Sequence, residues 1–173
     1  MPERATPDIV AKHLDALLVG MNPGLVSAAV GHNFANPGNG FWRLLHESGL
    51  LPKRLKPEEE SLLLEHGLGL TNLVGRPTAG VMDLNKEDYE RGRKELAHTI
   101  ETLKPRAVVF VGVMVYREFL GNAKKKNLSC GEMAETIAGA RVFVVPNPSG
   151  RNAHFSYAEM LAHFRGVAQA LGR

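Results

Sequence analysis

The chain lacks most features that would place it outside the ordinary globular class. Cys130 is the one cysteine among 173 residues, which excludes an internal disulfide and a zinc site built from several cysteines. We expect Cys130 to be a small, buried or half-buried filler. No apolar run approaches the roughly 20 residues that span a bilayer, and the start of the sequence has no apolar signal-peptide core. The sequence therefore predicts a cytoplasmic protein without a membrane segment.

Metal-ligand patterns and large charge imbalances are also absent. The seven histidines include no His-x-x-x-His pair, so we expect no metal, and no motif implies another cofactor. The formal net charge of +3 permits a polyanionic partner without requiring one. The densest basic run, residues 124–126, is either a solvated loop or a patch that faces phosphates.

What is present is an alternation of strand-like and helical patterns. Apolar, strand-like runs occupy residues 16–20, 106–112 and 141–146, and a fourth lies near 68–74. Helical patterns lie near 40–49, 57–65, 86–104, 113–120 and 155–171. The length suits one domain over 1–173, with residues 1–12 frayed. The alternation predicts a layered α/β fold with a mainly parallel sheet.

Two short asparagine–proline motifs follow two of these strands directly. The first is GMNPG at residues 20–24, and the second is NPSG at residues 147–150. In an open parallel sheet, ligands bind outside the carboxyl ends of the strands. Both turns are therefore candidate walls of one active site.

Four blocks of this sequence resemble the mismatch-specific uracil-DNA glycosylase / thymine-DNA glycosylase family. They are GMNPG at 20–24, HNFANPGNGFW at 32–42, GLTNLVGRPT at 69–78 and NPSG at 147–150. The resemblance covers roughly residues 14 to 171. It implies a three-layer α/β/α uracil-DNA glycosylase fold, which agrees with the alternation of elements.

The resemblance assigns roles to residues of the first three blocks. Asn22 resembles the family's water-positioning asparagine, and Thr71 matches a hydroxyl residue that helps to hold that water. Phe34 matches the aromatic that stacks on a flipped base, and the backbone N–H of Met21 is a natural donor to a base carbonyl. An amide is no base near neutral pH, so catalysis would rest on positioning and charge stabilisation. Phe41 and Trp42 are expected in the core.

Two further positions bear on the base itself. Ser27 matches the position where uracil-preferring members carry serine and thymine-active members carry alanine, so we expect uracil to be preferred over thymine. One methyl group gives only about 1–3 kcal/mol of discrimination, so weak thymine activity is expected. Asn147 stands where faster relatives carry a histidine, which predicts slow turnover.

The segment 150–153 corresponds to the family's loop that enters the duplex. Gly150 ends the NPSG motif and Arg151 follows, where bacterial members often place an apolar wedge. Arg151 is therefore the candidate wedge, and Asn152 and Ala153 are candidates to meet the orphaned guanine. The alternative for Arg151 is a surface arginine on a loop that leads into a helix.

Asp83 has two interpretations. It is either the N-cap of the helix that starts near Lys86, which we favour, or a carboxylate that reaches the reaction centre.

These observations predict a monofunctional DNA glycosylase, a monomer acting on double-stranded DNA with a mismatched or damaged base. Uracil, related lesions such as ethenocytosine and, weakly, thymine would be excised opposite guanine, leaving an abasic site. A catalytically weak DNA-binding module of the same fold is the alternative, and the combination of Asn22, Thr71 and Phe34 argues against it. A nucleotide hydrolase would need a phosphate-binding glycine motif, which the chain lacks.

Overall fold

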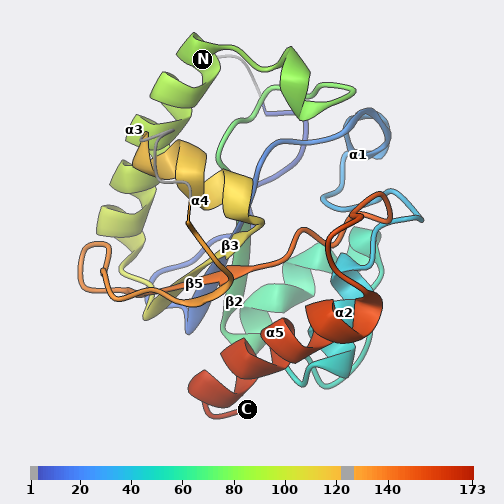
Figure 1. The fold of residues 1–173 in the computed structure, drawn as a ribbon, viewed down its shortest axis with the longest axis vertical. Helices are drawn as coiled ribbons and strands as arrows, with labels where there is room; N and C mark the ends of the chain where they lie inside the picture. Colours follow the sequence, from blue (N-terminus) through green and yellow to red (C-terminus); the bar gives the residue numbers. More distant parts are fainter. Residues whose placement is uncertain (1–3, 122–126) are drawn as a thin grey trace.

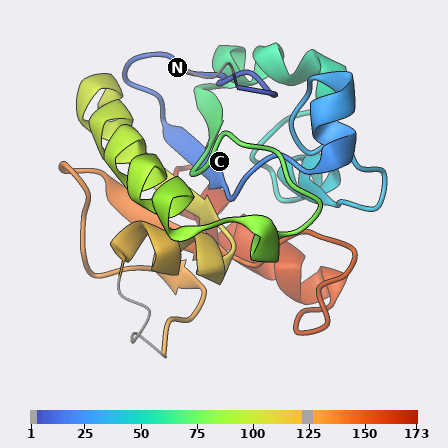
Figure 2. The same ribbon diagram turned by 90° about the horizontal axis from the view of Figure 1, so that it is seen from above.

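The computed structural model of the chain describes residues 4–121 and 127–173. Within these residues, a five-stranded sheet lies between helices (Figure 1; Figure 2 from above). Its spatial order is β2-β1-β3-β5-β4, and only the edge strand β4 runs antiparallel to its neighbour. The strands are β1 (Ala16–Gly20), β2 (Leu68–Asn72), β3 (Ala107–Val111), β4 (Gly131–Glu132) and β5 (Arg141–Val145). The predicted α/β fold is confirmed, whereas the basic run 124–126 lies outside the described residues.

Helices cover both faces of the sheet because successive residues of a strand point to opposite sides. Val108 and Phe110 of β3 belong to the apolar cluster formed with α3 (Lys86–Leu103) and α4 (Val113–Leu120). Val109 and Val111 belong to the other cluster, and all four are at most 3% exposed. That second cluster is formed with α2 (Phe41–Glu47), the 3₁₀ helix η1 (Pro57–His66) and α5 (Tyr157–Ala170). Phe41 and Trp42 are buried there as predicted.

The caps of α3 correct one prediction. Asn85 is its N-cap, because the Asn85 side chain accepts a hydrogen bond from the Asp88 backbone N–H at 2.9 Å. Asp88 returns the interaction by accepting from the Asn85 N–H, which completes a capping box. Asp83, the N-cap favoured from the sequence, lies two residues too early. It ends a separate short 3₁₀ helix, η2 (Val81–Asp83).

Other differences from the sequence patterns are small. Residues 57–66 form a 3₁₀ helix instead of an α-helix. Three short elements had no recognisable pattern: α1 (Leu25–Val30), η2 and β4. The N-cap position of α1 is Gly24, which makes no side-chain cap, so the usual start signal is missing. A two-residue strand such as β4 is too short to show alternation.

Arg4 and Ile9, within the segment for which fraying was expected, contact β2. Ile9 exchanges two backbone hydrogen bonds with Leu70 of β2, at 2.9 and 2.8 Å. The Ile9 side chain is 7% exposed, and burying it contributes about 2 kcal/mol. Arg4 donates to the Asn72 carbonyl at 2.8 Å. The edge of β2 offers free backbone groups, which explains why this segment is held.

Candidate functional site

The carboxyl ends of the parallel strands meet on one rim of the sheet. Gly20 of β1 pairs with Asn72 of β2, and Val111 of β3 pairs with Val145 of β5. The loops that follow these strands converge there, as the two asparagine–proline motifs predicted. They border a cavity of about 370 Å³, called here the rim cavity. Of the predicted site residues, six line it: Met21, Asn22, Ser27, Phe34, Asn147 and Arg151.

The amide of Asn22 is oriented by the loop that follows β2. Its Nδ2 donates to the Arg76 carbonyl at 2.9 Å and to Thr78 Oγ1 at 2.8 Å. A carbonyl can only accept, and the Thr78 hydroxyl hydrogen is directed to the Gly80 carbonyl at 2.8 Å. Both amide hydrogens of Asn22 are therefore committed. Its Oδ1 is the group that remains to accept a hydrogen bond in the rim cavity.

The structure does not bring Thr71 to Asn22. Thr71 is 4% exposed, and its hydroxyl donates to Asp8 Oδ1 at 2.7 Å. It does not line the rim cavity, whereas Asn72 does. Neighbouring side chains on a strand point to opposite faces, so only one of the two can reach the cavity. Thr78 supplies the hydroxyl beside Asn22 instead, within the block 69–78 that carried the resemblance.

An aromatic platform forms one wall of the rim cavity. The ring of Phe34 stacks on the buried ring of Phe41, with centroids 4.0 Å apart and planes 16° apart. Phe34 has a positive φ of 51°, an uncommon conformation for a residue with a side chain, and its ring lies next to Gly20 of β1. A Cβ placed on Gly20 would lie 3.2 Å from that ring, so glycine keeps the space open. Ser27 is 6% exposed, and its hydroxyl accepts from the Ala35 N–H at 3.1 Å, which braces the residue that follows Phe34.

Asn147 is oriented by its own turn. Its Oδ1 accepts from the Ser149 backbone N–H at 3.0 Å, and its carbonyl accepts from Asn152 Nδ2 at 2.9 Å. Because Oδ1 is used by the turn, the amide hydrogens of Asn147 are the groups offered to the rim cavity. Asn22 and Asn147 therefore present opposite polarity: an acceptor and a donor.

The NPSG loop packs against the loop at residues 36–40, which Figure 1 shows on the side of the molecule nearest α1. Gly40 N–H donates to the Pro148 carbonyl at 2.9 Å. A Cβ on Gly150 would come within 2.6 Å of the Gly38 carbonyl oxygen, so this contact requires glycine. Beyond it, Arg151 and Ala153 are exposed and Asn152 is partly exposed. Gly150, Asn152 and Ala153 do not line the rim cavity, and of this segment only Arg151 does.

Asp83 lies outside the rim cavity as well. It is exposed, and its carboxylate accepts from the Gly80 backbone N–H at 3.2 Å. Its backbone carbonyl accepts from Arg76 at 2.8 Å. The contacts of Asp83 thus hold the turn that carries Thr78.

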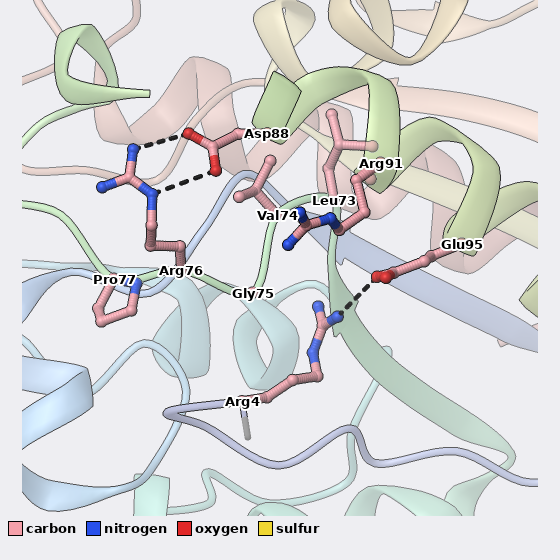
Figure 3. A pocket seen from close by; sticks show the side chains of 10 residues that line it. Arg4, Leu73, Val74, Gly75, Arg76, Pro77, Asp88, Arg91 and Glu95 are labelled. Carbon is pink, nitrogen blue, oxygen red and sulfur yellow. Dashed lines mark hydrogen bonds and ion pairs between the residues drawn. The ribbon is translucent and has the colours of Figure 1, made fainter. Parts of the chain in front are cut away.

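A second cavity, of about 410 Å³, is lined in part by residues 73–77, just before this turn (Figure 3). The guanidinium of Arg76 forms two hydrogen bonds to the carboxylate of Asp88, at 3.1 and 2.7 Å. The hydrogen bond from Arg76 holds the pKa of Asp88 below its usual value, and the capping bond from Asn85 acts in the same direction. The ion pair with Asp88 thus anchors Arg76, whose backbone carbonyl orients the amide of Asn22. Arg4 forms a second ion pair in the same cavity, with Glu95 at 3.6 Å.

Outside these two cavities, the described residues hold little further chemistry. Among them, no group of three or more His, Cys, Asp or Glu side chains is placed to hold a metal ion. No helix in that part of the chain is long and apolar enough to cross a membrane. Cys130 is half-buried, and burial raises the pKa of its thiol to about 11.

Comparison with known proteins first defines the class of fold. The solution NMR structure of a candidate uracil DNA glycosylase from Methanosarcina acetivorans superposes with a TM-score of 0.61 and 21% sequence identity. The match covers 94% of this chain and 96% of that one, so the two share a fold.

The family follows from the sequence. The family model described as "Uracil DNA glycosylase superfamily" matches residues 7–172, and the chain belongs to that superfamily. Membership supports a hydrolase that acts on the N-glycosyl bond of uracil in DNA. The broader part of the predicted resemblance is thereby confirmed, and the mismatch-specific branch stays a prediction.

Proposed function

We propose that this protein is a monofunctional, monomeric DNA glycosylase of the cytoplasm that excises uracil from mismatches with guanine. The observation that carries the proposal is the committed amide of Asn22, which leaves its Oδ1 as an acceptor in a cavity walled by the Phe34 platform. Related lesions such as ethenocytosine and, weakly, thymine would also be released. The product is an abasic site in double-stranded DNA.

In this proposal, Asn22 holds the attacking water through Oδ1. Thr78 and the Arg76 carbonyl prevent rotation of the amide, which would otherwise present N–H groups to the water. Because the amide is no base, the rate gain comes from positioning and from stabilisation of charge on the leaving base. Donors for that charge are the Asn147 amide and the backbone N–H of Met21.

The base must leave the helix before it can be cut. Stacking on Phe34 compensates for lost stacking in the duplex, at about 1–3 kcal/mol per base. Arg151, which is exposed and lines the rim cavity, would fill the vacated space. Asn152 and Ala153 follow it as candidates to meet the orphaned guanine. Ser27, buried in the wall, leaves less room for a methyl group than alanine would, which favours uracil.

The test is single-turnover base release from labelled duplexes that carry G·U, A·U, G·T or single-stranded U. We expect the fastest release from G·U, and its near loss in Asn22→Ala with duplex binding retained. Chelation with EDTA should leave the rate unchanged. Binding without release from any duplex would instead favour the DNA-binding module.

The same assay tests whether the Asp83 carboxylate takes part in the reaction. Because its carboxylate is exposed and bonded to the Gly80 N–H, we expect Asp83→Asn to leave the single-turnover rate unchanged. A large fall would assign the carboxylate to the reaction centre.

A further inference from the structure

A buried carboxylate contacts the two residues that precede Phe34 and has no role in the chemistry described above. Glu60 of η1 is 3% exposed. Its two oxygens face three nitrogens: His32 Nδ1 at 2.6 Å, the Asn33 backbone N–H at 3.2 Å and Asn33 Nδ2 at 2.7 Å. Burying a carboxylate is costly unless it is well bonded, so this arrangement is a built one. All three donors belong to the two residues that precede Phe34.

The carboxylate decides how the Asn33 amide is turned. Asn33 Nδ2 donates to Glu60 Oε1 and also to the Pro7 carbonyl at 2.9 Å. Both partners can only accept, so the nitrogen must face them and both amide hydrogens are committed. The Asn33 Oδ1 is thereby directed the opposite way, toward β2. Asn33 is 2% exposed, so no solvent competes for these groups.

The orientation passes from Asn33 to Asn72. Asn72 Nδ2 donates to Asn33 Oδ1 at 2.9 Å, so the nitrogen of Asn72 faces Asn33. Its Oδ1 then lies on the other side, in the wall of the rim cavity. A Cβ on Gly20 would be 2.6 Å from that oxygen and 3.2 Å from the Phe34 ring. The oxygen therefore lies beside the platform on which a base would stack.

We infer that Glu60, through Asn33, fixes the polarity of Asn72 and so makes the site selective for bases that carry a ring N–H. Asn72 presents an acceptor, which uracil satisfies with its N3–H. Ethenocytosine has no hydrogen on that nitrogen, and cytosine has an acceptor there. Glu60 is thus a positioning residue that acts on specificity without touching the base. This inference rests on the proposed function.

The test compares Glu60→Leu with Glu60→Gln, and uses the ratio of single-turnover rates on G·U and G·ethenocytosine duplexes. Leucine removes the acceptor and lets Asn33 and Asn72 rotate, so we expect the uracil-to-ethenocytosine ratio to fall about tenfold. In Glu60→Gln the side-chain oxygen still accepts from Asn33, so the uracil-to-ethenocytosine ratio should stay close to that of the wild type. Equal losses on both substrates in Glu60→Leu would show that Glu60 only supports the fold, and would overturn the inference.

Two controls keep the test decisive. Glu59→Leu alters the neighbouring carboxylate of η1, which bonds the Lys56 N–H at 2.9 Å, and should leave the ratio unchanged. If Glu60→Leu does not fold, Asn33→Ala breaks the same relay at its middle and should lower the ratio as well. A ratio that is unchanged in Asn33→Ala overturns the inference.

Failure of the proposed function can be told apart from failure of this inference. If the wild type releases no base, binding of free uracil and free cytosine is compared by NMR titration of the amide signals. A preference for uracil that is lost in Glu60→Leu or Asn33→Ala supports the relay even without catalysis. Equal binding of the two bases by the wild type overturns it.

Discussion

Two single variants, Thr78→Val and Thr71→Val, show which threonine hydroxyl orients the amide of Asn22. Thr78 Oγ1 is 2.8 Å from Asn22 Nδ2, whereas Thr71 Oγ1 is bonded to Asp8. A neutral hydrogen bond contributes about 0.5–1.5 kcal/mol, which is about two- to twelvefold in rate. A rotated Asn22 also misplaces the water, and the loss then reaches about 100-fold. We expect Thr78→Val to lower the single-turnover rate by about 5- to 100-fold.

Thr71→Val should behave in the opposite manner. It removes a hydrogen bond to Asp8, a carboxylate that is 35% exposed, so the cost is discounted for solvent to about 1 kcal/mol of unfolding free energy. The melting temperature should fall by about 2–4 °C while the rate stays within about twofold of wild type. The assays are single-turnover release of uracil from G·U and thermal melting followed by circular dichroism. A slow Thr71→Val enzyme beside a fast Thr78→Val enzyme would refute the reasoning.

Three further outcomes are expected. Gly150→Ala forces its loop away from the Gly38 carbonyl, only 2.6 Å from the added Cβ, so affinity for G·U duplex in gel-shift titrations should fall; unchanged affinity would contradict this. The pKa of Asp88 is lowered by Arg76, so its stabilisation is present above the unfolded pKa of about 3.9 and is lost as pH falls through the lower folded pKa. Asp88→Asn should therefore lower the melting temperature at pH 7 and have less effect near pH 2, and equal effects would count against the ion pair. Because burial raises the Cys130 pKa to about 11, iodoacetamide at pH 8 should alkylate it much more slowly in folded than in denatured protein.

Much of the architecture was predictable because it depends on local patterns. The unbroken apolar run 107–111 indicated a strand buried on both faces, and each of its residues is at most 3% exposed. The asparagine–proline turns follow parallel strands, and the carboxyl ends of parallel strands share one rim of the sheet. The sequence was therefore enough to predict that the two turns lie close together. Met21, Asn22, Ser27, Phe34, Asn147 and Arg151 all lie there.

The choice between neighbouring residues was not predictable in the same way. Asp83 and Asn85 both suit an N-cap, and which one caps α3 depends on where the chain turns after η2. Ile9 pairs with β2 because β2 is an edge strand with free backbone groups. The order of strands in the sheet determines which strand lies at the edge, and the local sequence does not reveal that order.

The sequence by itself determined the class of fold, the rim that holds the site and the residue types available there, because alternation and turn residues act over a few positions. Only the tertiary structure decided which hydroxyl meets Asn22 and which way each amide faces. Those decisions depend on hydrogen bonds between distant residues: Thr78 lies 56 positions from Asn22, and Asn33 lies 39 positions from Asn72. A side-chain amide can present either its oxygen, an acceptor, or its nitrogen, a donor, to the same site. Neighbouring residues in space decide which of the two faces the cavity.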